Sequence, residues 1–131
     1  MLEDAILSGF LQKQGEKGLV KGWKKRWFIV SPDAPKYIRY QRKVSDEEEL
    51  GRINLELVSG VTPSEKNNGN EWAFFVDTPN RRYHLLAPDK ETMMYWISGI
   101  EKVRYFYFIF FFSSFLLFFN CISFVLASFS N

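Results

Sequence analysis

The sequence predicts a mainly β domain, a seven-stranded antiparallel barrel or sandwich capped by one C-terminal α-helix. Turn signals divide residues 5–88 into strand-sized pieces that are rich in β-forming residues. After Pro88 the apolar residues follow helical spacing instead. A run of short strands followed by one amphipathic helix indicates a sheet whose end is covered by that helix. The 131 residues suffice for one domain with one modest core.

The turn signals and the helix cap place each element in turn. We expect strands at residues 6–14, 23–30, 37–40, 51–55, 57–61, 72–76 and 82–86. Asp89 is a good N-cap, and Glu91 puts negative charge in the first turn of the helix. One apolar face of that helix is formed by Met93, Trp96, Ile97, Ile100 and Val103. We therefore expect this face to pack on the sheet.

Charge is distributed unevenly along the chain, although the net charge is only +2. Residues 13–43 contain ten Lys or Arg and two acids, whereas residues 44–104 contain seven bases and eleven acids. A chain polarised in this way presents a positive end to anionic partners. The bland alternative is an ordinary solvated basic face.

The basic residues gather on the first two predicted strands. Lys13 ends the first strand, and residues 24–28 of the second read Lys-Lys-Arg-Trp-Phe. Lys24 and Arg26 are two residues apart, so they share one face of their strand. Lysine supplies a mobile point charge to a phosphate, and arginine supplies a bidentate fork. The pattern therefore indicates a compact, multivalent phosphate ligand, such as a lipid headgroup.

The residue types argue against catalysis and against metal binding. Cys121 is the only cysteine and His84 the only histidine, and no Gly-rich phosphate loop precedes the helix. These residues do not form a nucleophile–base pair or a metal-ligand cluster. We expect a non-enzymatic module that needs no metal and no cofactor. Nucleic acid is not the expected partner, because the basic residues cluster at one hairpin and do not line a long groove.

Residues 5–104 resemble a pleckstrin homology (PH) domain. The resemblance rests on Gly-Phe-Leu-Gln-Lys at residues 9–13, Trp-Lys-Lys-Arg-Trp-Phe at residues 23–28, and Trp96 in the closing helix, taken in that order. It implies a role in targeting the chain to membranes by binding phosphoinositide headgroups. It also implies a cytoplasmic, peripherally membrane-associated location. The open alternative is a protein-interaction module of a larger regulator, such as an adaptor or a Rab GTPase-activating protein, with a small GTPase as one candidate partner.

The resemblance also implies which residues bind the headgroup. Lys13, Lys24 and Arg26, with Phe28 behind them, match the basic pattern of the family's phosphoinositide binders, and Tyr40 matches the family's headgroup-contacting tyrosine. Lys17 and Lys21 in the first loop are expected to be peripheral contacts to anionic lipid. The four acids at residues 46–49 fall in a loop that lies beside the pocket in this family, and they are expected to oppose tight binding.

Residues 105–131 differ from the rest of the chain. They carry no charge and contain ten of the fourteen phenylalanines. Phe, Ser, Leu, Ile and Tyr are the residues that uridine-rich RNA encodes, and Val103-Arg104 can be encoded by GTA-AGA, which resembles a splice donor. Our main hypothesis is a translated intron, with the exon ending near Lys102. A C-terminal membrane anchor and a packed structural segment are the alternatives.

Overall fold

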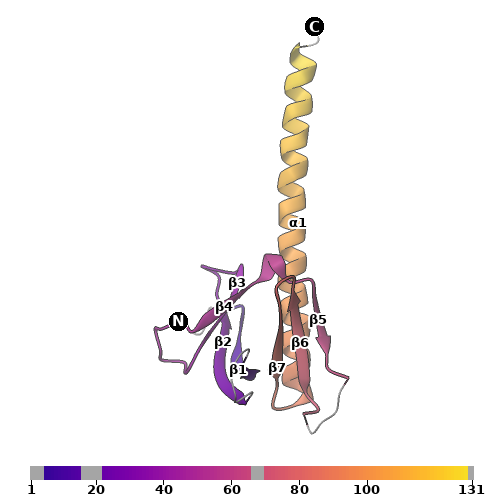
Figure 1. The fold of residues 1–131 in the computed structure, drawn as a ribbon. Coiled ribbons are helices and arrows are strands. Elements are labelled where there is room, and N and C mark those ends of the chain that lie inside the picture. The colour runs from indigo at the N-terminus through magenta and orange to yellow at the C-terminus, as the bar shows by residue number, and fades with distance from the viewer. Residues whose placement is uncertain (1–4, 16–21, 66–69, 130–131) are drawn as a thin grey trace.

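The computed structural model describes residues 5–15, 22–65 and 70–129 (Figure 1). The strands are β1 Leu7–Gln14, β2 Trp23–Val30, β3 Tyr37–Gln41, β4 Gly51–Asn54, β5 Gly60–Pro63, β6 Ala73–Thr78 and β7 Arg81–Leu86. A short 3-10 helix, η2 Leu55–Leu57, follows β4, and the long helix α1 Lys90–Phe129 ends the fold. All strand pairs are antiparallel, in the order β4-β3-β2-β1-β7-β6-β5. The predicted seven-stranded antiparallel fold with one C-terminal helix is confirmed.

The β1–β2 pair separates the apolar and basic residues of the sheet. Leu11 lies opposite Arg26 and Lys13 lies opposite Lys24. Directly opposed residues of an antiparallel pair share a face, and successive residues alternate between faces. The inner face therefore begins with buried apolar residues at one end of the two strands and finishes with Lys13, Lys24 and Arg26 at the other.

The core lies between the sheet and the first half of α1. Its largest fully buried side chains are Trp96, Phe28, Phe74, Leu11, Ile38, Ile53, Leu85 and Ile100. Trp96 is 1% exposed and meets the ring of Phe28 edge-on, with the centroids 6.2 Å apart. The helix begins as predicted, because the Asp89 carboxylate accepts a hydrogen bond from the Thr92 backbone N–H at 2.7 Å.

Two elements differ from their predicted positions. The strand expected at residues 57–61 is displaced to Gly60–Pro63, because Leu55–Leu57 forms η2. The Asn54 side chain caps η2 by accepting from the Glu56 backbone N–H at 3.0 Å. That cap turns the chain where the β-propensity of Leu57 and Val58 alone suggested a strand.

Helix α1 continues far beyond the barrel (Figure 1). Val103 is buried, and Tyr107 packs on the core as a partly buried residue. Beyond this point the helix projects away from the sheet (Figure 1). By length and composition it is the one helix of the described chain that could cross a membrane.

Candidate functional site

The structure brings four sequence-predicted residues together in one pocket. Lys13, Lys24, Arg26 and Tyr40 line a surface pocket of about 260 Å³. Gly15 and Leu50 complete its lining. The other two predicted contacts, Lys17 and Lys21, lie outside the described residues. The pocket is thus built from the ends of β1 and β2, from β3, and from the loop that precedes β4.

The alternation of the strands explains why the cations converge. Leu11 and Phe28 fill the core, and the next inward-facing positions along their strands are Lys13 and Arg26. The apolar interior therefore ends where the basic side chains begin. One N–H of the Arg26 guanidinium donates to the Lys25 carbonyl at 2.9 Å, which uses one of its five donors. Three positive groups in one pocket can hold phosphates of a polyanion at separate points.

Tyr40 links the pocket to the core. Its ring packs against Phe28 with the centroids 5.3 Å apart, and the Lys13 ammonium lies 5.2 Å from the centre of the same ring. The opposite residue on β4 is Gly51. A Cβ at Gly51 would lie 2.2 Å from the Tyr40 hydroxyl oxygen, so the tyrosine occupies this position only because a glycine faces it.

The acidic loop does not place its last carboxylate in the pocket. Glu49 pairs with Arg52, whose Nη2 lies 2.6 Å from Glu49 Oε2, and this hydrogen bond raises the pKa of Arg52. The next residue, Leu50, lines the pocket and donates its backbone N–H to the Tyr40 carbonyl at 2.9 Å. The electrostatic penalty expected from Glu49 is therefore reduced by its own ion pair. Leu50 is a pocket residue that the sequence did not indicate.

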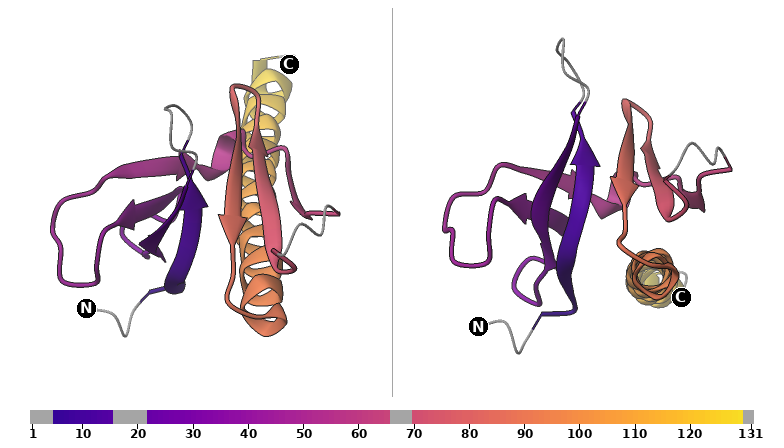
Figure 2. Two further views of the ribbon diagram at one scale, coloured as in Figure 1. Left: turned by 60° about the horizontal axis from the view of Figure 1, so that its bottom comes forward. Right: turned by 90° about the horizontal axis from the view of Figure 1, so that it is seen from below.

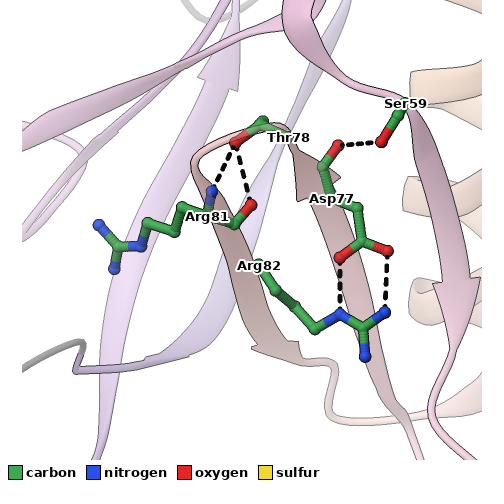
Figure 3. Close-up of polar contacts among 5 residues, drawn as sticks. All are labelled: Ser59, Asp77, Thr78, Arg81 and Arg82. Carbon is green, nitrogen blue, oxygen red and sulfur yellow. Dashed lines mark hydrogen bonds and ion pairs between the residues drawn. The ribbon is translucent and has the colours of Figure 1, made fainter.

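The β6–β7 hairpin lies at the same end of the barrel, because β7 runs antiparallel to β1 and begins where β1 ends. Asp77 accepts two hydrogen bonds from Arg82, at 2.6 and 3.2 Å (Figure 3). The Thr78 hydroxyl accepts from the Arg81 N–H and donates to the Arg81 carbonyl (Figure 3). The Ser59 hydroxyl donates to the Asp77 carbonyl at 3.2 Å, which ties β5 to the hairpin. Arg82 is thus engaged by Asp77, which raises its pKa.

The outer face of β1 and β2 uses its cation differently. The Lys25 ammonium lies 4.4 Å from the centre of the Phe10 ring, and Phe10 meets Trp27 edge-on at 4.8 Å. Because Lys25 is opposed by Gln12, it lies on the face opposite to Lys24 and Arg26. His84, the only histidine, meets Phe75 edge-on across the β6–β7 pair. The described residues hold no cluster of three or more metal-ligating side chains.

Comparisons with known proteins agree with this architecture. The PH domain family model matches residues 5–105. TBC1 domain family member 2A of Bos taurus is 34% identical over 99 residues, which are 76% of this chain and 10% of that protein. The chain therefore matches about a tenth of this relative.

Two solved structures illustrate the likeness. The PH domain of human TBC1 domain family member 2 superimposes with a TM-score of 0.67 and 32% identity, over 77% of this chain and 82% of that one. The C-terminal PH domain of pleckstrin, solved in complex with D-myo-Ins(1,2,3,5,6)P5, gives a TM-score of 0.65 and 33% identity, over 76% and 95%. PH domains are generally non-catalytic. With its family model, its relatives and its fold in agreement, this chain belongs to the PH domain family.

Proposed function

We propose that this chain is a non-catalytic targeting module that binds phosphoinositide headgroups in the pocket between β1, β2 and β3. The observation that carries the proposal is the convergence of Lys13, Lys24 and Arg26 on one pocket beside Tyr40. The pleckstrin domain solved with an inositol pentakisphosphate supports the ligand class, because its sequence is 33% identical to this chain.

The proposed mechanism is charge complementarity in a preformed pocket. The lysines neutralise phosphates as mobile point charges, and Arg26 adds a planar fork of donors. Tyr40 and Leu50 form the apolar wall of the pocket. Attraction to anionic lipid would bring the domain to a cytoplasmic membrane surface before the headgroup enters the pocket.

The test is vesicle co-sedimentation of residues 1–108 across phosphoinositide isomers. The fragment ends after Phe108 because Val103 and Tyr107 pack on the core, and it omits the apolar helix that would bind any bilayer. We expect Lys24→Ala/Arg26→Ala to lower the affinity about 100-fold, since each charged hydrogen bond contributes roughly 1.5–3 kcal/mol.

The matched control is Lys25→Ala/Lys102→Ala. It removes the same two charges, but Lys25 lies on the outer face and Lys102 is exposed on α1. We expect this control to bind within a few-fold of the wild type, because only non-specific attraction is reduced. Equal losses in the two variants would show general charge attraction and no pocket.

The alternative is a protein-interaction module within a larger regulator. Absence of binding to every isomer, or binding that Lys24→Ala/Arg26→Ala leaves unchanged, would favour it. Titration of the same fragment with soluble inositol hexakisphosphate separates the headgroup from the bilayer, because headgroup recognition by the pocket should persist without lipid.

A further inference from the structure

The part of α1 beyond the barrel has no role in the pocket and no polar face. Residues 105–129 carry no charge. Large side chains are exposed on several sides of this segment, among them Phe106, Phe108, Phe112, Leu117 and Phe118, each at least half exposed. A helix on the surface of a soluble protein keeps a polar face toward water, whereas a helix that is apolar all round requires burial.

Two ordinary explanations of an apolar helix do not fit. The core helix of a soluble protein is mostly buried, but only 6% of the most apolar window of α1 is buried. A secretory signal lies near the N-terminus, but this helix begins at Lys90. Association with a second copy calls for an apolar stripe with flanking charges, which residues 105–129 lack.

The length of the free segment matches the hydrocarbon core of a bilayer. Tyr107 and Phe108 still contact the barrel, where they line a groove with Leu55, Glu56 and Val58. The free helix therefore comprises residues 109–129. At 1.5 Å per residue it is about 31 Å long, and a bilayer core is about 30 Å thick.

We infer that residues 109–129 of α1 span a lipid bilayer and hold the barrel against one membrane surface. Lys102 and Arg104 precede the span, and Tyr105 and Tyr107 lie at its start, as basic and aromatic residues do at a cytoplasmic interface. Beside the helix at this level lies η2, where Leu57 is 49% exposed and can meet the interface (Figure 1). The coding origin of the segment does not alter what a bilayer does with it.

Insertion of α1 fixes the direction of the pocket. Seen along the axis of α1, β1 and β2 run across the view and end well away from the helix (Figure 2, right). The pocket lies at the ends of these strands. Because α1 is continuous from the barrel to Phe129, the pocket of the inserted chain opens along the membrane surface and does not face the anchoring bilayer.

The first test is cell-free synthesis of the full chain with phosphatidylcholine vesicles, followed by a carbonate wash and flotation. We expect the wild type to float, because aggregates sink and peripheral proteins are released. Leu117→Arg/Phe118→Arg places two charges near the centre of the span and should abolish flotation. Met94→Arg/Ser98→Arg makes a similar change at exposed positions beside the barrel and should float. Release of the wild type by carbonate, or flotation of the Leu117 variant, would overturn the inference.

The second test addresses crossing and orientation. A C-terminal epitope should resist external protease until detergent is added; digestion without detergent would contradict a span. In a Cys121→Ser background, a fluorophore at Leu57→Cys should be quenched several-fold more by headgroup spin labels than one at Lys24→Cys. Equal or stronger quenching at Lys24 would show that the pocket faces the bilayer. Neither measurement uses phosphoinositide, so failure of the proposed headgroup binding would leave both results interpretable.

Discussion

Gly51 is the position where one methyl group should disturb the pocket most specifically. In Gly51→Ala the new Cβ would lie 2.2 Å from the Tyr40 hydroxyl oxygen and 2.5 Å from Cζ, so the ring has to move. Tyr40 packs on Phe28, which is fully buried, so the core resists that movement. Overpacking of this kind costs about 1–3 kcal/mol. Backbone entropy alone has the opposite sign, because replacing a strand glycine with alanine stabilises by roughly 0.5–1 kcal/mol.

A double-mutant cycle separates these two effects. Urea unfolding of residues 1–108 should show Gly51→Ala destabilised by about 1–2 kcal/mol, the steric cost less the entropic gain. In a Tyr40→Ala background the same change should stabilise, because the clash is gone. The coupling energy should therefore exceed about 1 kcal/mol. Gly51→Ala that is neutral or stabilising with Tyr40 present would refute the close packing of these two residues.

Three further predictions concern the core, pH and the gene. Trp96→Ala should lower the free energy of unfolding by about 3–5 kcal/mol in urea titrations, because the indole is 1% exposed; a loss under 1 kcal/mol would contradict its place in the core. Burial and the nearby Arg82 lower the pKa of His84 below its ordinary 6.5, so stability is full above pH 6.5 and falls as the pH drops below it; His84→Gln should remove this component from urea midpoints measured between pH 7.5 and 5. Genomic DNA should contain a splice donor after Lys102, and an uninterrupted exon through Asn131 would exclude a translated intron.

The strands and the basic pattern could be predicted because both depend on local alternation. Lys24, Arg26 and Phe28 share a face in any strand, so their common direction follows from the sequence. The helix start could be predicted for the same reason, since Asp89 caps its own first turn. The displaced fifth strand was missed because a competing local bond, from the Glu56 N–H to the Asn54 side chain, decides that turn.

The remaining features of the pocket depend on contacts between segments far apart in the chain. Four consecutive acids at residues 46–49 suggested a field opposed to phosphate, but the effect depends on where each side chain points. Glu49 pairs with Arg52 on the outer face of β4, while Leu50 lines the pocket and is joined to Tyr40 through its backbone. The sequence shows the charges of this loop but not the face that each side chain occupies. The pairing of Tyr40 with Gly51 has the same character, because the need for a glycine appears only when β3 and β4 are in register. Residues that touch a ligand can thus be predicted from their own strand, whereas residues that shape the space around it require the register between strands.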